Sequence, residues 1–96
     1  MKRVIIVRPE AEEDLEMARD WYDDVHIELG DRFLDEVASA LEQLEQHPEQ
    51  NNFYYLSFRR ILFKRFPYKL FYQIMDNQII VFRVLHAKQC HQQGLK

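Results

Sequence analysis

The fold is decided by residues 54–74, which read YYLSFRRILFKRFPYKLFYQI. This stretch is rich in aromatic and β-branched residues, which are enriched in strands. Residues 54–66 therefore predict one strand, or two strands interrupted by a bulge, and residues 68–74 predict the next. Pro67 stands between them and marks a turn or a sheet edge, because it has no amide proton to give to a neighbouring strand.

One further hairpin completes the C-terminal sheet. Asp76 and Asn77 both tolerate a positive φ angle, so they predict a tight turn. Residues 78–86 read QIIVFRVLH, a β-branched and aromatic run that predicts the last strand. Strands joined by short turns pair in opposite directions, so this half of the chain predicts a mostly antiparallel sheet.

The N-terminal half begins with a strand and continues as a helix. Residues 3–8 are β-branched and bounded by charge, which indicates the strand. Pro9 suits the first turn of a helix, where its missing amide costs nothing. An apolar stripe with steps of four and three follows, and it comprises Ala11, Leu15, Ala18, Tyr22, Val25 and Leu29.

A second helix follows almost at once. Gly30 is suited to end the first helix in a left-handed conformation, and Asp31 is suited to cap the next one. The second helix has its own apolar stripe before Pro48 ends it, and the stripe comprises Leu34, Val37, Leu41 and Leu44. We therefore predict an α+β fold of order β-α-α-β-β-β, with the N-terminal helical hairpin packed on a mostly antiparallel sheet.

Length and composition predict one cytoplasmic domain over residues 1–96. Cys90 is the only cysteine, so no internal disulfide forms, which fits a reducing compartment. The apolar run of residues 4–7 is too short for a membrane span or a signal peptide. The two glycines build no phosphate-binding loop, and His86, Cys90 and His91 match no zinc module, so we expect no cofactor and no metal.

Charge is divided unevenly along the chain. Residues 1–48 carry five basic and fourteen acidic side chains (5 − 14 = −9), whereas residues 49–96 carry eight basic and two acidic ones (8 − 2 = +6). This division predicts a molecule with an acidic helical face and a basic strand face. The basic face is suited to an anionic partner, although cations at sheet edges also serve solubility alone.

The cations of the predicted strands are the main candidates for function. They are Arg59, Arg60, Lys64, Arg65, Lys69, Arg83, His86 and Lys88. A two-residue period places Arg60 with Lys64 on one face and Arg59 with Arg65 on the other, so at least one pair faces solvent. Ten of the thirteen aromatic residues lie within residues 53–82, among these cations, a mixture suited to stacking on bases and contact with phosphate.

The same residues resemble a known family. Residues 59–72 have an arginine-bearing strand, then Arg-Phe-Pro-Tyr at 65–68, then a strand ending in Phe-Tyr. Residues 80–88 read IVFRVLHAK, and the N-terminal half carries Asp14-Leu15 and the aromatic pair Trp21-Tyr22. Over nearly its whole length the chain is similar to the RelE/ParE toxin superfamily, with the ParE-like branch favoured.

The resemblance implies the toxin of a type II toxin–antitoxin pair, neutralised by a cognate antitoxin in the groove between hairpin and sheet, over residues such as Leu70 and Phe82. ParE-like members poison DNA gyrase, and the implied target-binding residues here are Arg59, Arg60, Arg83, His86 and Lys88. RelE-like members cut messenger RNA on the ribosome, and the catalytic residues would then be His86, Arg60, Lys64 and Arg65.

Three features favour the ParE-like branch. No tyrosine follows Tyr72, whereas many RelE-like nucleases have one near the C-terminus. The sequence pI of about 5.8 is low for a protein that binds ribosomal RNA, since neutralised phosphates supply much of that affinity. The two predicted helices are also long, as in ParE. A binding or scaffold protein of the same fold without toxicity is the remaining alternative.

Overall fold

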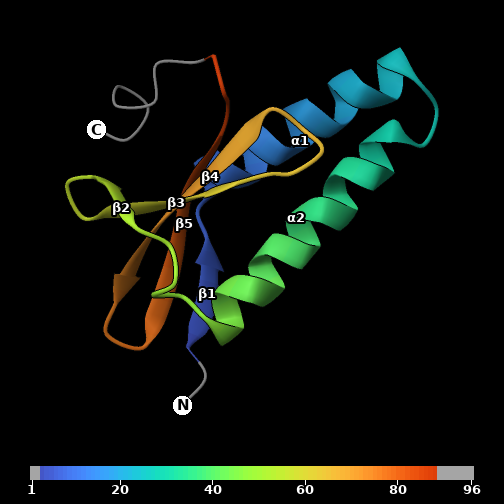
Figure 1. Ribbon diagram of the computed structural model, residues 1–96. Coiled ribbons are helices and arrows are strands. Elements are labelled where there is room, and N and C mark those ends of the chain that lie inside the picture. Colours follow the sequence, from blue (N-terminus) through green and yellow to red (C-terminus); the bar gives the residue numbers. More distant parts are fainter. Residues whose placement is uncertain (1–2, 89–96) are drawn as a thin grey trace.

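A five-stranded sheet and a hairpin of two helices make up the part of the chain, residues 3–88, that the computed structural model describes (Figure 1). The elements are β1 (Val4–Val7), α1 (Pro9–Val25), α2 (Leu29–Gln46), β2 (Phe53–Tyr55), β3 (Phe58–Leu62), β4 (Tyr68–Met75) and β5 (Gln78–His86). The predicted α+β class and element order are confirmed, and residues 54–66 adopt the two-strand alternative.

The strands lie in the order β1-β5-β4-β3-β2. All pairs are antiparallel except β1 with β5, where Val4 pairs with Gln78 and Val7 with Val81. The hairpin turn between β4 and β5 lies where it was predicted, with Asp76 at a φ of 55°. Because β1 stops at Val7, no strand within residues 3–88 pairs with the outer edge of β5 over residues 82–86.

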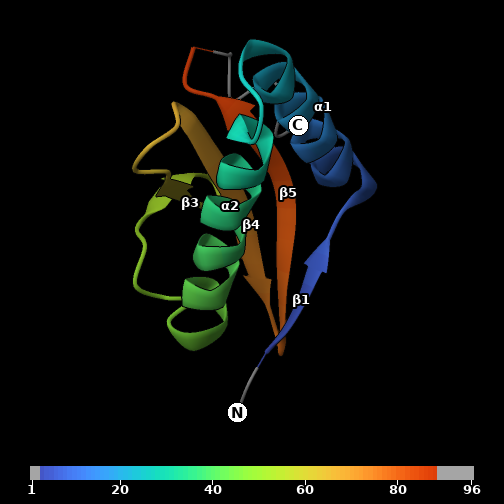
Figure 2. The same cartoon turned by 90° about the vertical axis from the view of Figure 1, so that its right-hand side faces the viewer.

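Both helices pack on the same face of the sheet, here called the helix side (Figure 2). The core between them is mostly aromatic at one end, where Phe33 is fully buried and its ring lies 5.2–6.0 Å from those of Phe63, Phe66 and Tyr68. Farther along the strands most of the buried side chains are aliphatic, among them Leu70 and Ile79, and the fully buried Tyr72 is the exception. Edge-on ring packing of this kind adds about 0.5–1.5 kcal/mol per pair beyond the area buried.

The turn between the helices differs from the prediction. The first helix ends at Val25, and the second already begins at Leu29, so Gly30 and Asp31 lie inside α2. Glu28, and not Gly30, takes the left-handed conformation, with a φ of 71°. The Asp23 carboxylate accepts a hydrogen bond of 2.9 Å from the amide of Gly30 and so satisfies a free amide in the first turn of α2. Asp31 was therefore wrongly expected as the cap.

Gly30 is required because α2 approaches α1 closely at this residue. A Cβ atom added there would lie 2.7 Å from the carbonyl oxygen of Arg19 and closer still to the carboxylate of Asp23. Real Cβ atoms essentially never come so close to backbone. Gly30 thus allows the start of α2 to lie against the last turns of α1, a packing role that the sequence pattern does not reveal.

A bulge in β5 sets which side chains face the helices. Phe71 pairs with Arg83 and Tyr72 pairs with Val81, so Phe82 is the extra residue without a register partner. Before the bulge Ile79 and Val81 face the helices, and after it Val84 does. Without the bulge, the two-residue alternation would put Arg83 on the face of Val81 and leave Val84 on the other.

We predict that Gly30→Ala destabilises the protein by about 1–3 kcal/mol, because the added methyl group overpacks the contact between the helices. Helix propensity alone predicts the opposite, a gain of up to about 1 kcal/mol. The measurement is the free energy of unfolding from urea denaturation. Ser39→Ala, an exposed change in the same helix, is the matched control and is expected to stay within about 0.5 kcal/mol of the parent. Stabilisation by Gly30→Ala would contradict the close approach.

Candidate functional site

The face of the sheet turned away from the helices, here called the open face, carries a small core of its own. Phe58, Phe71 and Leu85 are buried there, although no helix of the described chain covers them. Tyr54 and Phe82 pack over them, and the Phe58 ring meets the Phe82 ring edge-on at 4.8 Å. Within the described chain, aromatic side chains and not a second layer of helices or strands thus cover the small core of the open face.

Two guanidinium groups lie over these rings. The Arg60 group is 4.3 Å from the ring centre of Tyr54, and the Arg8 group is 4.4 Å from that of Phe82. Cation–π contacts of this kind hold an arginine side chain in place while leaving its edge free to bind. Arg8, which also pairs with Glu10, was not among the predicted site residues. It belongs here because β1 places it beside β5, a proximity that becomes visible only once the sheet order is known.

Lys69 adds a third cation to this face. It pairs in register with Leu62 on one side and with Leu85 on the other, and Leu85 belongs to the open-face core. We call Arg8, Arg60 and Lys69, with Tyr54 and Phe82, the cation–aromatic patch. Its members come from β1, β2, β3, β4 and β5 or their ends, so its geometry depends on the sheet and not on a loop.

Arg59 has a different environment from its neighbour. Its guanidinium lies 4.0 Å from the ring centre of Phe53 and donates hydrogen bonds to the carbonyl oxygens of Asn51 (2.5 Å) and Glu49 (3.3 Å). Beside it, the Tyr72 hydroxyl donates to the carbonyl of Pro48 at 2.6 Å, and burial raises the pKa of Tyr72. These bonds attach the loop after α2 to the sheet, so much of the hydrogen-bonding capacity of Arg59 is used internally.

Arg83 is also bound internally. Its Nε and a terminal nitrogen donate to the two oxygens of the Asp14 carboxylate at 2.6 and 2.9 Å. The same carboxylate accepts the Val84 amide at 3.0 Å. The hydrogen bond to Asp14 raises the pKa of Arg83, and the Asp14 side chain is only 13% exposed. The predicted separation of basic strands from acidic helices is therefore wrong at this point.

His86 lies in an aromatic pocket between α1 and the end of β5. Its ring meets the Tyr68 ring edge-on at 5.2 Å, and its Nδ1 accepts the amide of Lys88 at 3.1 Å. The pocket has a volume of about 600 Å³ and is mostly apolar, and it is lined by Asp14, Met17, Trp21, Tyr22, Pro67, Tyr68, Val84 and His86. Lys88 is exposed just beyond it.

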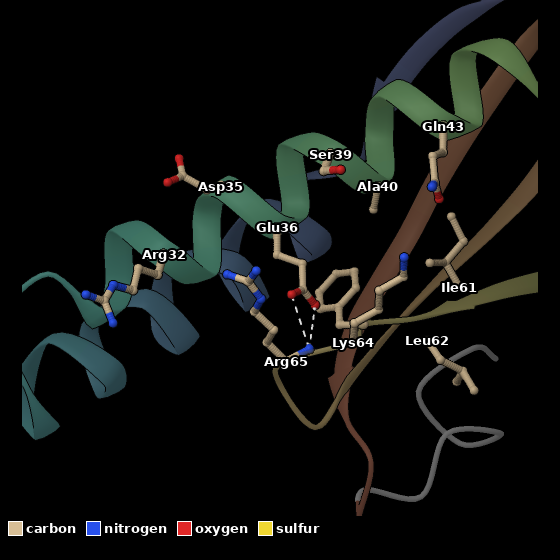
Figure 3. A pocket seen from close by; sticks show the side chains of 11 residues that line it. Arg32, Asp35, Glu36, Ser39, Ala40, Gln43, Ile61, Leu62, Lys64 and Arg65 are labelled. Carbon is tan, nitrogen blue, oxygen red and sulfur yellow. Dashed lines mark hydrogen bonds between the residues drawn. The ribbon is translucent and has the colours of Figure 1, made fainter.

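Lys64 and Arg65 lie on a third surface, a groove of about 330 Å³ between α2 and the end of β3 (Figure 3). β3 ends at Leu62, and the loop that follows buries Phe63 and Phe66 on the helix side. The amide of Arg65 donates to both oxygens of Glu36 at 3.2 Å, which fixes this loop to α2. Arg60 and Lys64 therefore do not share a face as predicted, because the strand ends before its alternation reaches Lys64.

The predicted residue sets are thus divided among separate surfaces. Of the implied catalytic residues, Arg60 is on the open face, Lys64 and Arg65 are in the α2 groove, and His86 is in the α1 pocket. Of the implied target-binding residues, Arg60 alone belongs to the cation–aromatic patch. Arg59 and Arg83 have internal partners, and His86 and Lys88 lie at the end of β5.

The burial of Leu70 contradicts one further expectation, the antitoxin-binding groove over Leu70 and Phe82. Leu70 is fully buried in the core beneath the helices, whereas Phe82 lies on the open face. One partner segment in a groove between hairpin and sheet could not cover both, because that space is already filled by side chains. The expected antitoxin groove over these two residues is wrong.

Two other features of the described chain concern metals and membranes. Within residues 3–88 there is no group of three or more His, Cys, Asp or Glu side chains that could hold a metal ion. Cys90 and His91, considered with His86 as metal ligands, lie outside these residues. Neither of the two helices is long and apolar enough to cross a bilayer.

One protein-family model matches the chain. The family model described as the ParE toxin of the type II toxin–antitoxin system parDE matches residues 5–90. A search of curated proteins gave no match. Among solved structures, the chain is similar to one from the chromosomal ParDE system of P. aeruginosa, with 16% identity, a TM-score of 0.79, and coverage of 88% of this chain and 96% of that one.

A second solved structure shares the fold less closely. It comes from the RelBE2 toxin–antitoxin complex of Mycobacterium tuberculosis, with 20% identity, a TM-score of 0.59, and coverage of 90% of this chain and 99% of that one. At such identities the likeness concerns the fold alone.

We predict that Asp14→Asn destabilises the protein by about 1–3 kcal/mol. The side-chain oxygen of asparagine can still accept a hydrogen bond from the backbone amide of Val84. The loss of stability therefore measures the contribution of the negative charge that faces Arg83. The expected loss of stability lies between the values typical of exposed ion pairs and of buried ion pairs. Asp20→Asn, at the exposed Arg19–Asp20 pair, is the matched control and should cost less than about 0.5 kcal/mol. Equal effects of the two changes on the free energy of unfolding would refute a structural role for Asp14.

Proposed function

The chain belongs to the ParE toxin family of type II toxin–antitoxin systems, and from this premise we propose that it inhibits DNA gyrase and is neutralised by a cognate antitoxin. On this proposal the protein acts as a single cytoplasmic domain without cofactor or metal. The toxin binds its target and does no chemistry of its own.

One observation carries the choice of target. A ribonuclease needs a general base, a general acid and cations within hydrogen-bonding reach of one scissile phosphate. The four residues implied for that chemistry are spread over the open face, the α2 groove and the α1 pocket. Their separation supports gyrase inhibition over messenger RNA cleavage.

The cation–aromatic patch is the surface that we propose for the gyrase contact. Arg60 is its central member, since its guanidinium is held on Tyr54 on a face that no described helix covers. Arginine and aromatic residues dominate the binding energy of many interfaces, and an arginine held in place loses little entropy on binding. Lys69 extends the positive surface, and Arg8, whose charge is paired with Glu10, adds its side chain over Phe82. His86 and Lys88 belong to the proposed contact only at its margin.

An antitoxin partner is supported by the solved relatives. Both structures described above come from toxin–antitoxin systems, and one of them is a complex with its antitoxin. We propose that a cognate antitoxin binds this chain as well.

We predict that Arg60→Ala weakens inhibition of gyrase at least about 10-fold, the equivalent of a hot-spot arginine. The measurement is supercoiling by purified gyrase at increasing concentrations of the toxin. Arg65→Ala removes an equal charge from the α2 groove and is the matched control, expected to inhibit like the parent. Circular dichroism verifies that both variants are folded.

Expression of the parent chain in bacteria tests the class of function. Filamentation with a DNA-damage response is expected. Immediate loss of translation with cleaved messages would overturn the gyrase proposal in favour of the ribonuclease, and unaffected growth would favour a binding or scaffold protein. Full inhibition by Arg60→Ala would leave gyrase as the target but refute the cation–aromatic patch as the contact.

A further inference from the structure

The open face of the sheet carries cations but no carboxylates. From Phe53 to Lys88 the chain has seven basic residues and one acidic residue, Asp76, which lies in the turn between β4 and β5. Register and alternation show which side chains of the described strands share the open face, and there is no Asp or Glu among them. A face with this composition is suited to an anionic partner.

Arg60 and Lys69 are the two cations that can bind such a partner with their full charge. No ion pair within residues 3–88 includes either of them, whereas Arg8 is paired with Glu10. Arg60 pairs in register with Phe71, two residues beyond Lys69 on β4. Arg60 and Lys69 are therefore diagonal neighbours on adjacent strands, about 7–8 Å apart. Two long side chains at this spacing can contact two phosphates of the same molecule.

The acidic residues of the helices lie on the opposite side of the sheet (Figure 2). α1 and α2 together carry thirteen acidic and two basic residues (2 − 13 = −11). An anion on the open face is separated from this charge by the sheet, and salt screens what remains over about 8–10 Å. The net charge of −3 therefore does not prevent the open face from binding a polyanion.

The aromatic rings of the cation–aromatic patch already have partners. The Arg60 guanidinium lies 4.3 Å from the ring centre of Tyr54, and the Arg8 guanidinium lies 4.4 Å from that of Phe82. A base cannot stack on a ring face that a guanidinium covers. The N–H groups at the edge of the Arg60 guanidinium are instead suited to phosphate oxygens, which accept strong, charge-assisted hydrogen bonds. The patch thus favours contact with a phosphate backbone over base stacking.

The even charge of this face favours a nucleic acid over an acidic protein surface. Protein–DNA interfaces are much more positively charged than protein–protein interfaces. Duplex DNA presents phosphates of both strands at a higher charge density than a single strand does. Contacts with phosphates also carry no sequence information, so a patch that makes only such contacts binds any duplex.

We infer that the cation–aromatic patch binds the phosphate backbone of duplex DNA without reading its sequence, with Arg60 and Lys69 as the main contacts. The inference rests on the proposed function only in assigning this contact to the DNA on which gyrase acts. Binding of DNA by the chain alone is a separate property, and it is measured without gyrase.

The experiment records the fluorescence anisotropy of a short labelled duplex as the full chain is added, at several salt concentrations. Neutralisation of two or three phosphates predicts that the logarithm of the binding constant falls with that of the salt concentration, with a slope of about −2 to −3. Duplexes of unrelated sequence should bind equally, and the corresponding single strand should bind more weakly.

Arg60→Gln combined with Lys69→Gln removes both charges and keeps most of each side chain. This variant should bind the duplex at least about 10-fold more weakly at about 50 mM salt, with a slope smaller by about 2, because each phosphate contact contributes about 0.9. Lys64→Gln combined with Arg65→Gln removes the same two charges from the α2 groove. It is the matched control, expected to bind like the parent. Circular dichroism verifies that both variants are folded.

Four results would overturn the inference. They are no binding of the duplex by the parent, binding that does not depend on salt, equal losses in the two double variants, and tighter binding of the single strand. Full inhibition of supercoiling without DNA binding would leave the gyrase proposal intact and would mean that the patch contacts the gyrase protein. DNA binding without inhibition would contradict the gyrase proposal alone.

Discussion

The arrangement of surfaces depends on the carboxylate of Asp14. It accepts two hydrogen bonds from the Arg83 guanidinium and one from the Val84 amide. They lie where β1 has ended and no other strand of the described chain lies beside β5. An unpaired strand edge invites pairing with other chains. By binding that edge, a residue of α1 attaches the helical hairpin to the sheet and prevents strand addition there.

Several features of function follow from this attachment. Arg83, which the sequence presents as a free cation of the last strand, is neutralised and held against α1. The bulge at Phe82 moves Arg83 off the face of Val81, and Phe82 lies on the open face, where Arg8 lies over its ring. The same contact sets the distance between α1 and β5, and thereby forms the pocket beside Trp21. The open face and the pocket beside Trp21 are consequently separate surfaces.

The sequence predicted what depends on local pattern. The aromatic and β-branched runs gave the strands, the steps of three and four gave the helices, and Arg-Phe-Pro-Tyr with Val-Leu-His gave the family. The sequence-based predictions failed where the role or position of a residue depends on the three-dimensional arrangement and not on its neighbours in the sequence. Gly30 was expected to end a helix by its conformation, whereas it is needed for its small size beside Asp23 and Arg19. Lys64 was assigned to a face by an alternation that stops at Leu62. Arg8 was overlooked because only the parallel pairing of β1 with β5 brings it to Phe82.

The most direct test of this account is hydrogen exchange at the Val84 amide. Edge amides with no strand partner usually exchange through local fluctuations, whereas core amides exchange with the stability of the whole protein. If the Asp14 carboxylate holds the edge of β5, the Val84 amide should exchange as slowly as the core amides of β5 in the parent, and faster in Asp14→Ala under conditions where that variant is still folded. Rapid exchange of the Val84 amide in the parent protein would contradict the account.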